Sequence, residues 1–371
     1  MKAVKMTLLF VGFSMCAQAQ DMESGGTMEK SDVAKDKLKG KVKTMAVTGF
    51  TVERREGKLK KGREIHTSTS NYNNKGYLLE YTSTEGDDTV QDQYVHFKAV
   101  RNTYKYDNNG TLVSNNKYNG QGVLEDSASY KVDSRGNRID WNTYKGDGTL
   151  EWNYNREFDE QGNLIESNEY YRGKLKSRHT YKYDNKQNIV EENYFDGEGR
   201  IKLKEIFNYD DKKNMTDVTD YNQNGNFQSK YTYKYDEKGN QIEERAFDNE
   251  HSDKFKKLLT KYDDEGNATE ATQYSENGKL VYECKMDKEG NHTLDITYNK
   301  DGKVIEKIAQ KYTYDEKGNE VENVRYGKNG KPQVKNKYLY TYDTEKNWFI
   351  KICYENDKPT RITERIIDYY Q

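Results

Sequence analysis

One unit of about 26 residues repeats along most of this chain of 371 residues, and it constrains the fold more than any other feature. Its clearest copy runs from Tyr231 to Glu244, where two tyrosines precede Asp236 and a Gly-Asn pair follows it. An asparagine stands four residues after the anchoring aspartate in nine of ten copies, and an aromatic residue stands eleven residues after it in all ten. Such periodic self-similarity indicates a repeat architecture. The anchors recur at intervals of 24 to 28 residues: Asp107, Asp133, Asp159, Asp184, Asp210, Asp236, Asp263, Asp287, Asp315 and Asp343.

Each copy contains two aromatic-rich runs with alternating polarity and two turns, a pattern typical of strands. In the first turn the aspartate side chain accepts backbone N–H groups, and glycine supplies the positive φ that other side chains resist. Short turns indicate antiparallel neighbours, because parallel strands need long crossovers. Only Pro332 and Pro359 occur, which suits continuous sheet because proline removes a ladder donor. The sequence therefore predicts an all-β fold, with tandem β-hairpin repeats of about 26 residues forming one elongated, twisted or coiled antiparallel sheet.

Alternation along the predicted strands assigns an aromatic face and a charged face. Leu175, Tyr181 and Tyr183 share one face of their run, whereas Lys174 and Lys182 share the other. The aromatic residue eleven positions after each anchor has the opposite parity to the apolar residue six positions after it. Either a bulge intervenes, or both faces carry aromatic residues.

Four copies of the turn motif carry a resemblance to a known repeat family. They are YKYDNNG at 104–110, YKYDNKQN at 181–188, YKYDEKGN at 233–240 and YTYDEKGN at 312–319. Over roughly residues 70 to 371 the chain resembles the YD-repeat, or RHS-repeat, family of bacterial surface and secreted proteins. The half-repeat YNKDGKVIEK at 298–307 is also similar to MORN-type hairpin repeats. The RHS resemblance implies carbohydrate ligands.

The N-terminal residues predict export. Residues 1–19 have the basic start, short apolar run and Ala-Gln-Ala cleavage site of a signal peptide. Lipoprotein anchoring through Cys16 is disfavoured, because Met15 stands where a small residue is required. Residues 20–41 are polar and predict a flexible tether, residues 42–100 predict atypical N-terminal capping strands, and residues 101–371 form the repeat array. The expected location is periplasmic, cell-surface or extracellular.

Charge and cysteine content limit the partners. Removing Lys2 and Lys5 with the signal peptide leaves 59 basic against 63 acidic residues, finely mixed. No basic face is indicated, so nucleic acid is excluded as a partner. Cys284 and Cys353 occupy different phases of the repeat, so no disulfide framework is expected. The apolar run near the N-terminus is too short for a transmembrane span.

Catalytic, metal and cofactor sites are not predicted. Carboxylate pairs such as Glu191-Glu192 and Glu243-Glu244 have the chemistry of glycoside hydrolysis, but acids recur in every copy, which favours a solvated face. The Asp-Gly-Asn turns offer calcium ligands, yet the turn itself already explains these residues. An outer-membrane barrel is disfavoured, because its charged face would meet lipid. The five histidines show no ligand spacing: His66, His96, His179, His251 and His292.

The aromatic residues that depart from the repeat are the best candidates for a binding site. Trp141 and Trp152 lie close in sequence to Tyr144 and Tyr154, and aromatic rings stack on the faces of sugars. Packing of these rings within the core is the alternative explanation. The predicted function is that of an exported, non-enzymatic repeat protein that binds carbohydrate or mediates cell-surface interaction. The alternative is a structural scaffold or protein–protein interaction module, which pairs through an exposed terminal strand.

Overall fold

The computed structural model describes residues 32–86, 97–248, 256–327 and 329–371. The predicted signal peptide, Cys16 and residues 20–31 of the predicted tether lie outside these ranges. The described chain contains one short helix, α2 (Asp32–Lys35), and a single antiparallel sheet of 24 strands. The all-β prediction is therefore confirmed.

The first twelve strands are β1 (Val42–Arg55), β2 (Lys58–Tyr72), β3 (Leu78–Gly86), β4 (Phe97–Tyr106), β5 (Leu112–Asn119), β6 (Leu124–Val132), β7 (Arg138–Lys145), β8 (Leu150–Phe158), β9 (Leu164–Tyr171), β10 (Lys174–Tyr183), β11 (Ile189–Asp196) and β12 (Ile201–Tyr209). The remaining strands are β13 (Met215–Asn222), β14 (Phe227–Tyr235), β15 (Gln241–Asp248), β16 (Lys256–Tyr262), β17 (Ala268–Tyr274), β18 (Leu280–Met286), β19 (His292–Tyr298), β20 (Val304–Tyr314), β21 (Glu320–Tyr326), β22 (Pro332–Tyr342), β23 (Trp348–Glu355) and β24 (Lys358–Tyr369).

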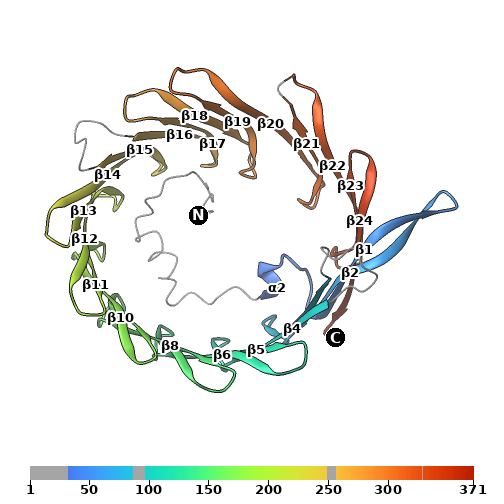
Figure 1. The fold of residues 1–371 in the computed structure, drawn as a ribbon, viewed down its shortest axis with the longest axis horizontal. Coiled ribbons are helices and arrows are strands. Elements are labelled where there is room, and N and C mark those ends of the chain that lie inside the picture. The colour runs from blue at the N-terminus through green and yellow to red at the C-terminus, as the bar shows by residue number, and fades with distance from the viewer. Residues whose placement is uncertain (1–31, 87–96, 249–255, 328) are drawn as a thin grey trace.

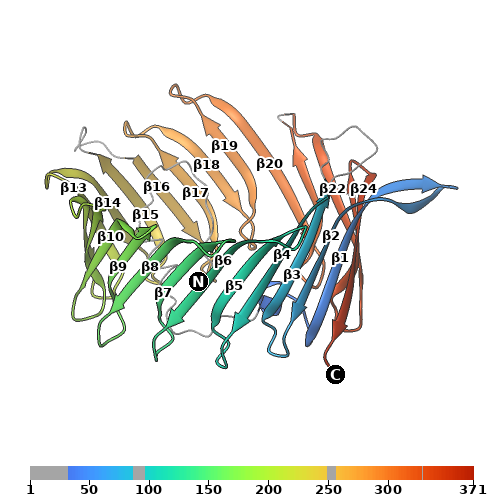
Figure 2. The same cartoon turned by 60° about the horizontal axis from the view of Figure 1, so that its bottom comes forward.

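The sheet closes into a barrel, which corrects the predicted elongated, twisted or coiled shape. Each strand pairs with its neighbours in sequence, and β1 also pairs with β24 from Val42↔Tyr369 to Phe50↔Ile362. Figure 1 shows the resulting ring, and Figure 2 shows the strands tilted along its wall. Closure satisfies the backbone groups that two free edges would leave unpaired. The described residues of the predicted capping segment, 42–86 and 97–100, form β1 to β3 and the start of β4, which take part in the same ring.

The turn after each anchor is built on the aspartate side chain. Asp236 Oδ1 accepts the backbone N–H groups of Lys238 at 3.0 Å and Asn240 at 2.8 Å, while Asn240 Nδ2 donates to Asp236 Oδ2 at 2.9 Å. Gly239 has a φ of 84°. In three copies the equivalent residue is not glycine: Gln187, Lys213 and Lys346 have φ of 66°, 67° and 68°. Because that conformation costs about 1 kcal/mol for such residues, the backbone N–H bonds to Asp184, Asp210 and Asp343 hold the turn where glycine is absent.

A β-bulge resolves the parity of the repeat. In β13 a register shift accompanies the pairs Asn208↔Asp217 and Tyr209↔Met215. Met215 and Val218, three residues apart, consequently pack in the same cluster around buried Phe207. Uninterrupted alternation would place them on opposite faces. Both explanations for the parity conflict hold: the bulge intervenes, and Tyr221, three residues after Val218 in an uninterrupted part of β13, lies on the opposite face from the tyrosines packed with Val218.

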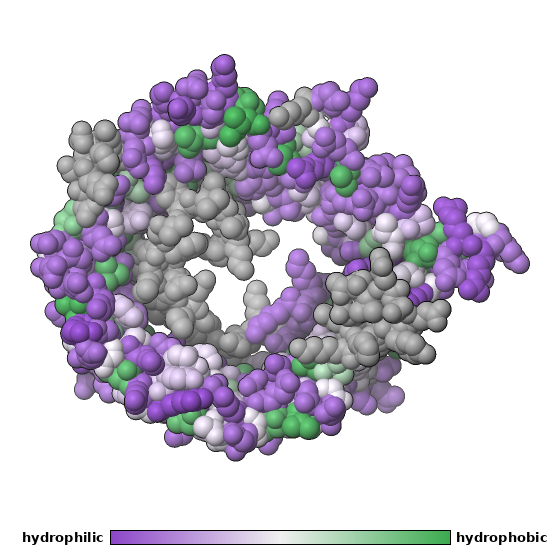
Figure 3. Space-filling model, in the orientation of Figure 1, coloured by the Kyte–Doolittle hydropathy of each residue, from purple (hydrophilic) through white to green (hydrophobic). Residues whose placement is uncertain are grey.

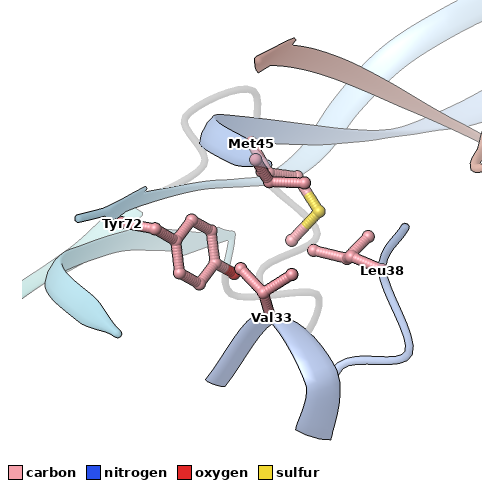
Figure 4. Packing of buried hydrophobic residues seen from close by; sticks show 5 residues of the cluster. Val33, Leu38, Met45 and Tyr72 are labelled. Atoms are coloured by element: carbon pink, nitrogen blue, oxygen red, sulfur yellow. The ribbon is translucent and has the colours of Figure 1, made fainter. Parts of the chain in front are cut away.

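Helix α2 identifies the inner face of the barrel. It lies inside the ring (Figure 1), where Val33 and Leu38 pack against Met45 and Tyr72 (Figure 4). Val33 N–H donates to the Gly76 carbonyl at 3.1 Å. Residues 32–41 belong to the interval expected to be a tether, yet in the structure they pack on the wall, because Val33 and Leu38 remove apolar surface from water there.

The surface viewed along the ring is largely hydrophilic, with hydrophobic residues in small separate patches (Figure 3). Asn73 takes the place of an anchor in an earlier turn, because its Oδ1 accepts the N–H groups of Lys75 and Tyr77. Tyr72 directly precedes Asn73, and Leu78 follows it by five positions; both lie in the cluster with α2. Positions one, three and five before each anchor, and five, eight and ten after it, therefore face inward. The core is one layer of side chains on this inner face.

A cross-link between β1 and β24 tests the closure. Ala46 lies directly opposite Ile366, and both follow the outward alternation next to the inward Met45 and Ile367. Opposed residues on paired strands meet the Cα separation that a disulfide needs. We expect the Ala46→Cys/Ile366→Cys variant to form an intramolecular disulfide under mild oxidation, visible as faster migration on a non-reducing gel. The matched control is Ala46→Cys/Val304→Cys, whose second site lies on β20 and is exposed. Equal cross-linking in both variants, or in neither, contradicts the closed barrel.

Candidate functional site

Five rings on adjacent strands form a continuous aromatic surface on the inner face. We name this set the aromatic arc: Tyr130 of β6, Trp141 of β7, Trp152 and Tyr154 of β8, and Tyr171 of β9. Trp141 stacks on Tyr154 with ring centroids 4.6 Å apart, and Trp152 lies 4.7 Å from Tyr171. Tyr130 and Trp141 are direct cross-strand partners, as are Trp141 and Tyr154. The register of the strands thus builds the arc.

The arc contains three of the four residues predicted as a binding site. Trp141, Trp152 and Tyr154 come together, but Tyr144 does not join them. Tyr144 follows Trp141 by three residues in an uninterrupted stretch of β7, so it points to the outer face. Tyr130 and Tyr171 were missed: Tyr130 is an ordinary repeat tyrosine, three residues before Asp133, and Tyr171 directly follows the repeat aromatic Tyr170. Only the register between neighbouring strands identifies these two residues; it places Tyr130, for example, directly opposite Trp141.

Polar groups border the arc. The Tyr130 hydroxyl donates to Asn115 Oδ1 at 2.8 Å. Glu169 lies directly opposite Tyr154 and accepts a hydrogen bond from Ser177 at 2.8 Å. Burial, together with the neighbouring Glu169 carboxylate, raises the pKa of Tyr154. Trp141 Nε1 is buried and has no hydrogen-bond partner among the described residues. The arc therefore combines apolar ring faces with polar groups along its border.

Three carboxylates follow the arc along the same wall. We name Glu192 of β11, Glu205 of β12 and Asp220 of β13 the carboxylate row. They are successive cross-strand partners, Glu192↔Glu205 and Glu205↔Asp220, and both glutamates are only 3% exposed. His179 Nδ1 lies 3.0 Å from Glu192 Oε1, and Ser229 donates to Asp220 Oδ2. Glu192 Oε2 and Asp220 Oδ1 are buried without a partner in the part of the chain that the structure describes.

Burial and mutual repulsion hold a proton in the carboxylate row. Burial raises the pKa of Glu205 to about 8, and the Glu192 and Asp220 carboxylates add to this effect. Burial also raises the pKa of Asp220, although the Ser229 hydroxyl lowers it in part. Like charges directly opposite one another destabilise a sheet. Glu205, which lies between the other two members of the row, is therefore protonated at neutral pH.

The adjacent acids Glu191 and Glu192 have different environments. Glu191 points outward and pairs with Lys182 at 2.7 Å and Lys204 at 2.9 Å, whereas Glu192 points inward and is buried. The sequence argument that repeated acids form one solvated face fails for Glu192, because alternation sends neighbouring residues to opposite faces. The same division means that this pair cannot face one substrate.

A third group on the inner face combines different donor types. Cys284 of β18 and His292 and Asp295 of β19 each place one potential metal-ligand atom within 4.8 Å of the others, and no other such group occurs in the described ranges. Sequence reasoning found no ligand spacing for the histidines. The linear spacing is indeed uninformative, and only the cross-strand register brings the three together. Cys284 and Cys353 lie on separate strands and neither forms a disulfide.

Comparisons with known proteins leave the family open. No protein-family model and no curated protein matches the chain. The chain is similar to part of a Photorhabdus luminescens Tc holotoxin pore structure, with 12% identity over 81% of this chain and 17% of that chain and a TM-score of 0.41. A TcdB2-TccC3-TEV crystal structure gives 11% identity over 81% and 19%, with a TM-score of 0.42. A porin-like protein from Bacteroides uniformis gives 10% identity over 89% and 98%, with a TM-score of 0.26.

These similarities assign neither a family nor a function, because the identities and TM-scores are too low. The chain spans only about a fifth of the length of the toxin chains. The YD-repeat resemblance stays a prediction. Among the described residues, no helix is both long and apolar enough to cross a membrane.

The carboxylate row predicts a pH dependence of stability. The unfolded chain releases the Glu205 proton near its ordinary pKa of 4.5, whereas the folded protein holds it to about pH 8. The folded state binds more protons between these values, so this residue lowers stability as pH rises through that window. We expect Glu205→Gln to unfold with a free energy on the order of 5 kcal/mol higher than wild type at pH 9, and to match wild type at pH 4.

Urea denaturation at the two pH values measures the difference. Glu191→Gln is the matched control, because it removes an outward acid held by two lysines and should show no gain at pH 9. An equal gain of Glu205→Gln at both pH values would assign the effect to packing and contradict the proton held in the row.

Proposed function

We propose that this protein is exported and binds its ligand, without catalysis, on the inner face of the barrel. The aromatic arc is the contact surface, and carbohydrate is the ligand class. The observation that carries the proposal is the convergence of Trp141, Trp152 and Tyr154 from two strands onto one inward-facing surface. The two tryptophans depart from the repeat, so the turn and strand pattern does not require them.

The chemistry of the arc suits a sugar. Tryptophan and tyrosine rings offer broad apolar surface at low conformational cost, together with a polar N–H or O–H group. Asn115 and Glu169 supply acceptors and donors beside the rings, and Trp141 Nε1 is unpaired in the described structure. Small-molecule sites combine such aromatic lining with a few placed polar groups. Because Trp141 and Tyr154 cover each other's faces, the ligand would contact the outer members of the stack and the ring edges.

The placement of the acids supports a non-catalytic role. A glycosidase needs two carboxyl groups that flank one bond. Glu191 and Glu192 point to opposite faces, and Glu243 is engaged outward by Lys234 at 3.0 Å and Arg245 at 2.8 Å. Export rests on the N-terminal residues described above. Carbohydrate surfaces outside the cell are the matching location.

A scaffold that contacts other proteins is the second candidate function. Closure of the barrel changes the surface through which such contacts would form. β24 is paired with β1, so the terminal strand does not offer a free edge for strand addition. The exposed side chains of Ile366 and Val304, 69% and 53% accessible, favour contact through the outer face instead. Scattered residues of this kind are weaker evidence than a continuous surface.

A glycan-array screen of the full chain tests the proposal. We expect binding to a defined set of immobilised glycans, and at least about a tenfold loss of affinity in the Trp141→Ala/Trp152→Ala variant, as for other aromatic anchors. Trp348→Ala is the matched control, because Trp348 lies beside Tyr340 and Arg365, outside the arc.

Circular dichroism and the melting temperature confirm that each variant is folded. Equal loss in the control variant would remove the arc as the site. Absence of binding to every glycan by the folded wild-type protein would refute the carbohydrate ligand and favour the scaffold.

A further inference from the structure

Cys284, His292 and Asp295 lie on one hairpin of the inner wall. Cys284 is the direct cross-strand partner of Asp295, and His292 pairs with Met286 two residues further along β18. Their sulfur, nitrogen and oxygen atoms lie within 4.8 Å of one another. We propose that these three side chains form a binding site for a transition-metal cation of the zinc type.

The repeat does not require these residue types. They stand three positions before, five after and eight after the anchor Asp287. The preceding copy has Thr260, Ala268 and Ala271 at these positions, and the following copy has Tyr312, Glu320 and Asn323. The three departures occur in one copy, and the strand register turns their separate sequence positions into one cluster.

The donor set and its spacing fit a tetrahedral cation. Thiolate, imidazole and carboxylate are the ligands of zinc, and bonds of 2.0 to 2.3 Å place ligand atoms about 3.3 to 3.8 Å apart. In the structure His292 Nδ1 lies 2.7 Å from Asp295 Oδ1, joined by a hydrogen bond. A cation takes the place of the proton between them, which requires these atoms to separate by about half an ångström. Cysteine binds a metal as the thiolate, so binding also requires loss of the Cys284 thiol proton.

The cluster is buried on the side of the barrel wall and accessible from the barrel interior. Cys284 is 2% exposed and packs with Ala271 and Met286, whereas the His292 and Asp295 side chains retain 29% and 19% of their exposure. The thiol thus closes the wall side, and the other two ligands reach the inner surface. A site with three protein ligands keeps a fourth position for water or a ligand atom.

Tyr282 acts as a positioning residue. Its hydroxyl donates to Asp295 Oδ1 and lies 3.3 Å from His292 Nδ1. A donor bonded to a ligating carboxylate fixes its orientation, and loss of such a partner costs about 10- to 100-fold in metal affinity.

Cobalt(II) titration of the full, reduced chain tests the site. We expect one saturable equivalent with visible d–d bands and a thiolate-to-cobalt charge-transfer band, both lost on adding zinc. Cys284→Ser should abolish the charge-transfer band, and Tyr282→Phe should keep the band while weakening binding about tenfold. Cys353→Ser is the matched control, because it removes the other described thiol, which lies on β23.

The outcomes of the cobalt titration distinguish a site at Cys284 from the absence of such a site. A band retained in Cys353→Ser and lost in Cys284→Ser establishes the site, and a folded His292→Ala variant should bind cobalt at least tenfold more weakly. No saturable band in the wild-type chain, or equal loss in both cysteine variants, overturns the proposal. Glycan binding is measured separately, and neither result depends on the other.

Discussion

The carboxylate of each anchoring aspartate is the group on which the structure depends. It accepts the backbone N–H group four residues onward, and in most copies also the one two residues onward, as Asp236 does from Lys238 and Asn240. The turn persists at Gln187, Lys213 and Lys346, where glycine is missing and the left-handed backbone is costly. These bonds reverse the chain at a fixed point, so each strand lies beside its neighbour in sequence. The bulge beside the turn then shifts the alternation of side chains by one residue. Met215 and Val218, which are three positions apart, therefore both face inward.

A repeat of this kind produces two surfaces with different chemistry. Outward acids such as Glu191 lie between lysines, where water and opposite charges stabilise them. Inward acids such as Glu205 lie among packed tyrosines and other carboxylates, and the protein protonates the acid instead of pairing it. Tyrosine makes the second environment possible, because its ring fills space and its hydroxyl finds a partner. A chain with few aliphatic residues can thus cover one face of a sheet.

Closure converts this two-faced sheet into an inside and an outside. The β1–β24 ladder joins residues more than 300 positions apart, for example Ala46 and Ile366. It removes strand addition as a route to partners and places the aromatic arc, the carboxylate row and the Cys284 cluster on one enclosed wall. Their members come from separate strands, so each site exists only in the assembled register. The repeat supplies the framework, and departures from it supply the chemistry.

The sequence by itself determined the strands, the turns, the antiparallel order and three of the five residues of the aromatic arc. Those features depend on local hydrogen bonds and on spacing, which a repeat displays openly. The sequence did not reveal closure, because the curvature that brings β24 to β1 is the sum of small twists over the whole sheet. It also concealed Tyr130, the row around Glu205 and the partners of His292. These depend on which residue stands opposite which across two strands, and only the tertiary structure decides that register.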